Sequence, residues 1–315
     1  MRVGENPGRD LLRLLVWYPL RLVAERLPFG AALALYRAMG RLHQRLSRGR
    51  TGRIAQAVRR VAPGLTPPAQ AQAVADAFAT HYVNQLLVFN LPRLTCENIN
   101  QLIEITGLSR LEAARGHGRG VVLPLGHFGP TQLPLAALGA LGFPMLQIGH
   151  LSDAGLSFIG KHVAFRLRAR YEGRIPARIV PPGPGTRQAL AHLRAGGIVM
   201  TTADDGPGQP PFGRHAVVDF PGGPLSVPLG PARLALATGA VLLPVFLEAG
   251  TVSPYRLVIE GPISPPPSSV GAGAAAERGR DAAALAMTEA WAAAYAARVV
   301  AAPGWWHGLE AHVFP

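Results

Sequence analysis

The sequence predicts an α/β fold, a mixed sheet flanked by helices with amphipathic helices at the N-terminus. After residue 96, short apolar runs alternate with helix-length segments, which is the pattern of strand and helix units around a sheet. The run GVVLPLGH at residues 120–127 is apolar almost throughout, as in a strand buried on both faces. With 315 residues, 49% of them hydrophobic and 16% charged, the chain is long enough for one large domain or two small ones.

The N-terminal region predicts helices over residues 11–60 and a further helix that begins after Thr66, a candidate cap followed by two prolines. Residues 11–39 are apolar but interrupted by arginines, so no run reaches the roughly 20 apolar residues of a spanning helix. There is no cleavage site of a secretory signal. Trp17, Tyr18 and Phe29 among leucines and arginines favour helices lying at a membrane interface, and packing on the core is the alternative.

We therefore divide the chain into a membrane-associating helical segment, residues 1–95, and an α/β domain, residues 96–315, expected to form one continuous unit. In the second part we predict strands and helices in alternation and an irregular proline- and glycine-rich stretch from residue 216 to a helix at Pro231. The predicted strands lie at 97–107, 120–127, 143–150, 177–182, 198–205, 241–250 and 255–261. The predicted helices lie at 108–120, from about 131, at 157–170, 186–197, 230–240 and 281–300.

The charge is strongly basic, with 31 Lys and Arg against 18 Asp and Glu, and nearly all of the cations are arginine. Arginine binds phosphate and carboxylate oxygens in pairs, so phosphates, an acidic protein or an anionic membrane are possible partners, although a GC-rich genome explains the bias equally well. The scattered basic residues and the lack of zinc-finger or RNA-recognition patterns argue against nucleic acid. The single cysteine, Cys96, excludes an internal disulfide, and we expect a buried thiol.

Polar residues at the carboxyl ends of predicted strands are the candidates for function, because loops meet helix N-termini there. His127 ends the strand at 120–127, and Gln132 follows five residues later. Asp204 and Asp205 end the strand at 198–205 and precede a Gly/Pro loop. Taken alone, a lone histidine is more often an ordinary core or surface residue, and an Asp pair before glycine is more often a turn.

Several segments together resemble the lipid A biosynthesis (LpxL/HtrB-like) lysophospholipid acyltransferase family. The segments, in chain order, are GHFGPTQ at 126–132, Asp204–Asp205 before a glycine-containing loop, Phe220–Gly222, and Gly230–Ala240 with Pro244 in the next strand. Trp305, Trp306 and His307 near the C-terminus also match, so the resemblance covers nearly the whole chain.

The resemblance implies a glycerolipid acyltransferase-like fold and acyl transfer from an acyl-carrier-protein or CoA thioester to a hydroxyl of a lipid or glycolipid. It also implies a peripheral or monotopic location on the cytoplasmic face of the bacterial inner membrane. His127 would act as general base, and backbone N–H groups near Phe128–Thr131 would hold the oxyanion. No covalent intermediate, metal or other cofactor is needed, and no G-x-S-x-G or H-E-x-x-H motif is present.

Gln132 departs from the family, which has Glu or Asp five residues after the histidine. Its amide oxygen can accept a hydrogen bond from the ring N–H, but it supplies no charge, and a flipped amide presents NH2 instead. Three explanations stay open. His127 and Gln132 work as a pair, or Asp204 or Asp205 takes the place of the acid, or the activity is weakened or lost and the protein only binds.

The predicted catalytic residues are accordingly His127, Gln132 and Asp204. The resemblance and the loop positions further predict substrate-binding residues: Phe128, Gly129, His150, Asp205, Arg214, Gly222 and Gly223. The alternatives to an acyltransferase are a non-catalytic lipid- or acyl-carrier-binding protein and a thioesterase that uses water as the acceptor.

Overall fold

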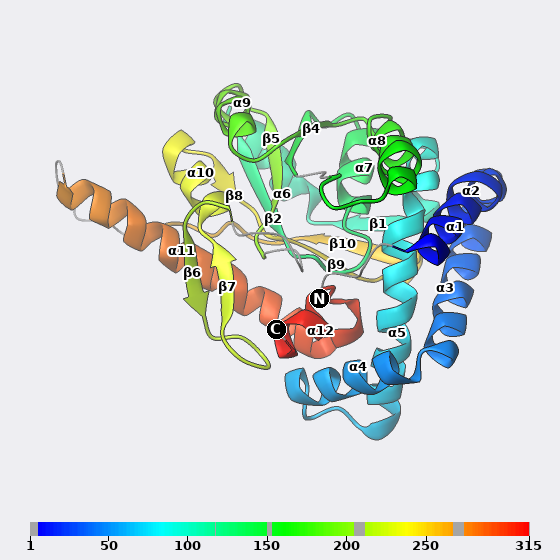
Figure 1. The fold of residues 1–315 in the computed structure, drawn as a ribbon. Coiled ribbons are helices and arrows are strands. Elements are labelled where there is room, and N and C mark those ends of the chain that lie inside the picture. Colours follow the sequence, from blue (N-terminus) through cyan, green and yellow to red (C-terminus); the bar gives the residue numbers. More distant parts are fainter. Residues whose placement is uncertain (1–5, 117, 150–152, 205–211, 267–273, 315) are drawn as a thin grey trace.

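A five-stranded parallel sheet forms the centre of the molecule, in the strand order β4-β3-β5-β2-β8 (Figure 1). The computed structural model describes residues 6–116, 118–149, 153–204, 212–266 and 274–314. The strands are β2 (Val121–Leu125), β3 (Met145–Ile148), β4 (Arg178–Val180), β5 (Ile198–Thr202) and β8 (Val241–Leu242). All five residues of β2 are buried, as the apolar run predicted.

A second sheet has three strands in the order β1-β10-β9, in which β1 is parallel to β10 and β9 is antiparallel to it. These strands are β1 (Ile103–Thr106), β9 (Val245–Ala249) and β10 (Tyr255–Ile259). The strand predicted at residues 97–107 is therefore shorter than expected, because a 3₁₀ turn at Ile99–Gln101 (η4) precedes it. Cys96, expected to be buried, is exposed, since it lies just before this turn.

The proline- and glycine-rich stretch after residue 214 forms a hairpin, so the prediction of irregular structure was wrong. Strands β6 (His215–Val218) and β7 (Leu225–Pro228) pair antiparallel. The glycines at the tip supply the positive φ angles that the reversal requires, 92° at Gly222 and 143° at Gly223. Proline is tolerated here because β7 pairs with β6 alone and Pro228 is its last residue.

Helices flank the sheets, and the predicted α/β class is confirmed. Proline stands in the first turn of α7, α9 and α10, and α10 ends at Gly239 in the left-handed region, so the sequence marks these helix ends. The helices are α6 (Leu108–Gly116), α7 (Leu133–Ala140), α8 (Arg166–Glu172), α9 (Pro184–Arg194), α10 (Gly230–Thr238), α11 (Ala274–Ala301) and α12 (Leu309–Val313). Shorter turns are η2 (Leu87–Phe89), η3 (Leu91–Arg93), η5 (Gly160–Phe165) and η6 (Pro303–Trp305).

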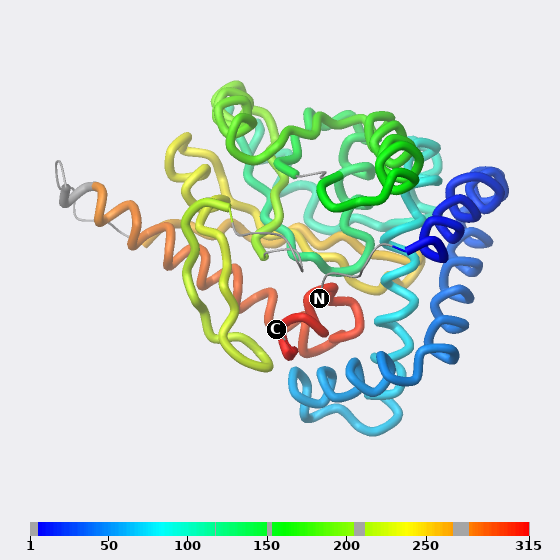
Figure 2. The backbone as a smooth tube through the Cα atoms, viewed as in Figure 1, coloured from blue at the N-terminus to red at the C-terminus, as the bar shows by residue number. Residues whose placement is uncertain are grey.

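The N-terminal helices lie together on one side of the sheets, where α3 and α4 pack against α5 (Figure 2). They are α1 (Pro7–Leu15), η1 (Val16–Leu20), α2 (Arg21–Ala24), α3 (Phe29–Leu46), α4 (Arg48–Val61) and α5 (Pro67–Leu86). Thr66 is the N-cap of α5, as predicted, although its side chain makes no capping hydrogen bond. Trp17, Tyr36 and Phe89 share one apolar core with Leu123 of β2, so these helices are packed onto the α/β part.

A second apolar cluster surrounds the carboxyl end of β2. It joins α5, the turn after β2, the β6–β7 hairpin, α11 and the C-terminal segment. Its aromatic members are Phe78, Phe128, Phe220, Phe246, Trp291, Tyr295 and Trp306. No helix in the described ranges combines the length and the apolarity that crossing a membrane requires.

Candidate active site

Strand register brings His127 and Asp204 together. In the parallel pair β2–β5, Leu125 lies opposite Thr202, so both strands end at the same level of the sheet. The N–H of Ala203 donates to the carbonyl of Leu125 over 2.8 Å, which continues the pairing by one residue. His127 follows the end of β2 by two positions, and Asp204 follows the end of β5 by two positions. These two residues, 77 apart in sequence, therefore become neighbours.

The imidazole and the carboxylate form a hydrogen-bonded pair. Nδ1 of His127 lies 2.9 Å from Oδ1 of Asp204. The backbone N–H of His127 also donates to the carboxylate, over 2.8 Å to Oδ1 and 3.0 Å to Oδ2. Asp204 is 3% exposed, whereas the His127 side chain is 22% exposed. The buried acid therefore holds a ring that faces the accessible side.

Tyr295 of α11 is the third member of this group. Its hydroxyl donates to Oδ2 of Asp204 over 2.9 Å. Burial, followed by the negative charge of Asp204, raises the pKa of Tyr295 well above its usual value, so the phenol keeps its proton and remains a donor. Gly126 is required beside it, because a Cβ there would lie 2.2 Å from the Tyr295 ring. Sequence reasoning missed Tyr295, which stands in an alanine-rich helix without a motif of its own.

The contacts of Asp204 decide the hydrogen position on the imidazole. A carboxylate oxygen accepts, so Nδ1 of a neutral His127 carries the hydrogen and Nε2 is the nitrogen that bears the lone pair. This is the tautomer that a general base needs. The arrangement can therefore remove a proton from a hydroxyl group placed against Nε2.

Gln132 does not hold the ring. It is the N-cap residue of α7, and its Oε1 is buried without a hydrogen-bond partner among the described residues. Of the three explanations that the sequence left open, the geometry agrees with the one in which Asp204 stands in for the missing acid.

The backbone N–H groups after His127 are already used, so the expected oxyanion site at Phe128–Thr131 does not hold. The N–H of Phe128 donates to Gly126 O over 2.8 Å, and that of Gly129 donates to Trp305 O over 2.9 Å. The N–H of Thr131 donates to Oδ1 of Asn84 over 3.0 Å, and Pro130 has none. These bonds stabilise the turn instead of facing a substrate.

The C-terminal segment fixes this turn from the other side. Phe128 and Trp306 form an antiparallel bridge, and the N–H of His307 donates to His127 O over 2.9 Å. Nε2 of His307 donates to Gly129 O over 2.7 Å. Burial lowers the pKa of His307, which favours the neutral ring. Gly129, at φ 64°, adopts the left-handed conformation that this turn needs.

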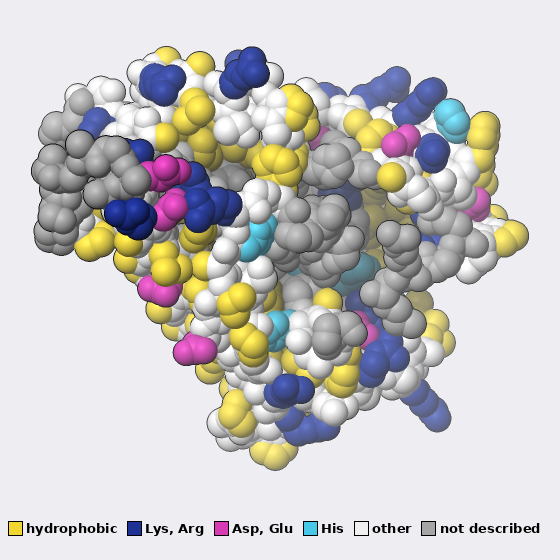
Figure 3. Space-filling view, turned by 60° about the vertical axis from the view of Figure 1, so that its left-hand side comes forward, with side chains coloured by type: hydrophobic (Ala, Val, Ile, Leu, Met, Phe, Trp, Pro, Cys, Tyr) yellow, Lys and Arg dark blue, Asp and Glu magenta, His cyan; other side chains and the backbone are white. Residues whose placement is uncertain are grey.

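A cavity of about 530 Å³ opens beside Asp204 at the carboxyl ends of β3 and β5. Its walls are largely apolar, and Arg214 and Arg233 stand at its edge. Both arginines contact Asp281, at 2.8 and 3.3 Å, so two cations share one carboxylate. In Figure 3, basic and acidic side chains gather side by side on this part of the surface, where α10 and α11 come forward.

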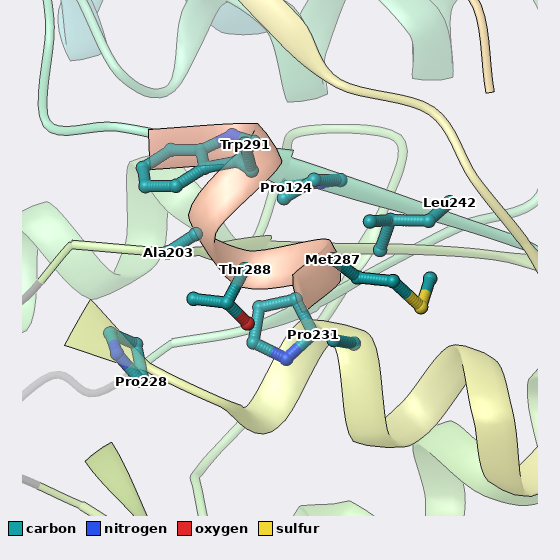
Figure 4. Close-up of a pocket in the computed structure, with 9 residues that line it drawn as sticks. Pro124, Ala203, Pro228, Pro231, Leu242, Met287, Thr288 and Trp291 are labelled. Atoms are coloured by element: carbon teal, nitrogen blue, oxygen red, sulfur yellow. The ribbon is translucent and has the colours of Figure 1, made fainter. Parts of the chain in front are cut away.

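Beside Ala203, the residue before Asp204, the protein is packed. Figure 4 shows Trp291 and Met287 of α11, Pro231 of α10 and Pro124 of β2 around a void. Its volume is about 10 Å³, room for about one water molecule. The 530 Å³ cavity therefore does not continue as a large channel through this part of the core.

The other predicted binding residues are spread over the molecule. Phe128 is 6% exposed and packs in the second apolar cluster. A Cβ on Gly222 would touch Val61 and His312, so the hairpin tip lies against α4 and α12 and does not line the cavity. Gly223 is at the same tip. His150 and Asp205 lie outside the described residues.

No group of three or more His, Cys, Asp or Glu side chains within the described ranges is arranged to hold a metal ion. A His–Asp pair at the carboxyl ends of parallel strands is an arrangement that can activate a hydroxyl group or water for attack.

The chain matches the model of the bacterial lipid A biosynthesis acyltransferase family over residues 10–307, and it belongs to that family. The resemblance found in the sequence is thereby confirmed. No curated protein gives a significant match. Membership in this family indicates an acyltransferase of the lipid A type. The general substrates of such enzymes are an acyl thioester donor and a lipid acceptor.

Proposed function

We propose that the protein transfers a fatty acyl group from an acyl-carrier-protein or CoA thioester to a hydroxyl of a lipid or glycolipid acceptor, with His127 as general base. The observation that carries the proposal is the 2.9 Å hydrogen bond between Nδ1 of His127 and the buried Asp204. It prepares Nε2 to accept a proton, which agrees with the chemistry of the family.

The reaction needs one base and no covalent intermediate. Nε2 of His127 takes the hydroxyl proton while the acceptor oxygen attacks the thioester carbon. The tetrahedral intermediate that forms carries its negative charge on the former carbonyl oxygen. When the C–S bond breaks, the sulfur takes the proton from the imidazolium and leaves as a thiol. Asp204 stabilises the imidazolium between these steps.

The cavity beside Asp204 is suited to an amphipathic substrate. Its apolar walls fit an alkyl chain, and the guanidinium of Arg214 at its edge fits a phosphate. Arg233 lies on the same edge and shares Asp281 with Arg214. We assign the cavity to part of a substrate that carries both an acyl chain and a phosphate.

The N-terminal helices supply a surface suited to a membrane. Leu11, Leu12 and Leu15 of α1 are 59, 55 and 52% exposed, and Tyr18 follows at 48%. Leu46 of α3 is 77% exposed, and α3 and α4 carry many arginines. Apolar side chains next to arginine suit an anionic bilayer surface. We propose peripheral binding at the cytoplasmic face of the inner membrane.

The test is an acyl-transfer assay with palmitoyl-CoA or palmitoyl acyl carrier protein, with and without a lipid A precursor that has free hydroxyl groups. We expect acylated lipid to form with the wild type and to be lost in His127→Ala. Loss of the thioester without lipid would indicate a thioesterase. If acyl chains bind but neither transfer nor hydrolysis occurs, the protein is a non-catalytic homologue and the proposal fails.

His192→Ala is the matched control. His192 lies on α9, its Nε2 contacts Pro144 O at 2.8 Å, and it is not among the described residues that line the 530 Å³ cavity. The His192→Ala variant loses one imidazole, as His127→Ala does, but we expect it to keep the acyl-transfer activity. Equal loss in both variants would indicate damage to the fold and would remove the support for His127.

A further inference from the structure

The assignment of the group that stabilises the oxyanion of the tetrahedral intermediate rests on the proposed function. The negative charge on the former carbonyl oxygen needs hydrogen-bond donors in fixed positions. The usual donors would be backbone N–H groups in the turn after His127. Those of Phe128, Gly129 and Thr131 donate elsewhere, and Pro130 has none.

Gln132 is the nearest unassigned polar side chain along this turn. It lies five residues after His127, at most about 17 Å away even in an extended chain. The turn is folded, since the N–H of Leu133 donates to Pro130 O over 2.9 Å. Both residues therefore stand at the same end of β2, one before and one after the closed turn.

The amide of Gln132 has the orientation of a donor. Its Oε1 is buried without a partner, whereas its NH2 is neither buried nor hydrogen-bonded within the described part of the chain. The residue as a whole is partly exposed. The group that a substrate can reach is thus the NH2.

From these observations we propose that the side-chain NH2 of Gln132 donates a hydrogen bond to the oxyanion of the tetrahedral intermediate. This explains why the position holds an amide. With Asp204 holding the imidazole of His127, an amide at position 132 can serve as a donor, whereas a carboxylate there would place negative charge beside the oxyanion. Gln132 is then a catalytic residue, because it touches the reacting atoms.

The experiment compares Gln132→Met and Gln132→Glu with the wild type, in the transfer assay with palmitoyl-CoA. Methionine keeps the size of the side chain and removes the donor. We expect kcat to fall by about 10²- to 10³-fold with little change in the KM for palmitoyl-CoA. We expect the melting temperature to stay or rise, because the unpartnered buried oxygen is also removed. A lower melting temperature with unchanged kcat would indicate a structural residue.

Gln132→Glu keeps the shape and tests the opposite explanation. A carboxylate facing the oxyanion should reduce kcat at least as much as methionine does. A transfer rate equal to or above the wild type would overturn the proposal, because it would show that this position still works as the acid of the family. This variant decides the matter even if Gln132→Met does not fold.

Gln147→Met is the matched control. Gln147 lies on β3, is 5% exposed, and also has a buried Oε1 without a partner in the described ranges. We expect its kcat to match the wild type. His127→Ala separates the two proposals. If it remains active, the proposed function fails; if it is inactive while Gln132→Met is fully active, only the assignment of Gln132 fails.

Discussion

Replacing Asp204 by asparagine removes the negative charge beside His127 while it keeps the shape of the side chain. An asparagine can place its Oδ1 against the N–H and Nδ1 of His127 and its NH2 against the hydroxyl of Tyr295, which then accepts. The tautomer of the ring is preserved in that arrangement. The expected loss is therefore electrostatic.

The magnitude follows from the contact distance. Two unit charges about 4 Å apart interact by about 4 kcal/mol near a protein surface, which is the stabilisation that the imidazolium loses. We expect kcat to fall by about 10²- to 10⁴-fold, because about 4 kcal/mol corresponds to roughly a 10³-fold change in rate. Because the ring loses an adjacent negative charge, the acidic limb of the pH profile of kcat/KM should move to lower pH.

The assay is acyl transfer from palmitoyl-CoA at several pH values, with thermal unfolding measured for each variant. Asp76→Asn is the control, since within the described residues the side chain of Asp76 on α5 accepts a local bond from Gln72, over 2.8 Å, and none from the active site. It should leave kcat unchanged. An Asp204→Asn variant that is folded and within threefold of the wild type, or whose pH profile does not move, would refute the pairing of His127 with Asp204.

Three further substitutions test the surroundings. Tyr295→Phe removes one hydrogen bond to the carboxylate, so we expect unfolding to become about 1 kcal/mol easier and kcat to fall by less than about tenfold; an unchanged melting curve would contradict this. Burial lowers the pKa of His81 from 6.5 to about 4, so the unfolded chain binds its proton more readily and stability decreases as the pH falls from 6.5 towards 4. The loss at pH 5 should be about 1–2 kcal/mol and should shrink in His81→Gln, measured by thermal unfolding at pH 7 and 5. Leu12→Ser with Leu15→Ser on α1 should weaken binding to phosphatidylglycerol vesicles in a sedimentation assay, whereas Val252→Ser, at a 90% exposed position in the loop between β9 and β10, should not; equal binding by all would place the membrane contact elsewhere.

The sequence predicted the elements that local patterns specify. The apolar run of β2, the proline and glycine at the ends of α10, and the polar residues at two strand ends were all visible without the structure. The hairpin at residues 215–228 was missed because its strands are short and contain proline, which normally argues against a strand.

The partner of His127 depended on information that spacing along the chain does not contain. Gln132 is near in sequence, but Asp204 is brought to the ring by the register of two parallel strands. Tyr295 reaches the same carboxylate from a helix 91 residues further on. The occupied N–H groups of Gly129 and Thr131 were equally hidden, since their acceptors lie in the C-terminal segment and on α5.

The most direct test of the account is the rate of acyl transfer from palmitoyl-CoA to a lipid A precursor by the wild type, His127→Ala, Asp204→Asn and Gln132→Glu. We predict transfer by the wild type, none above background for His127→Ala, and strongly reduced kcat for the other two. Full activity of Asp204→Asn together with a faster Gln132→Glu would contradict the account, because the imidazole would then depend on position 132 and not on the buried aspartate.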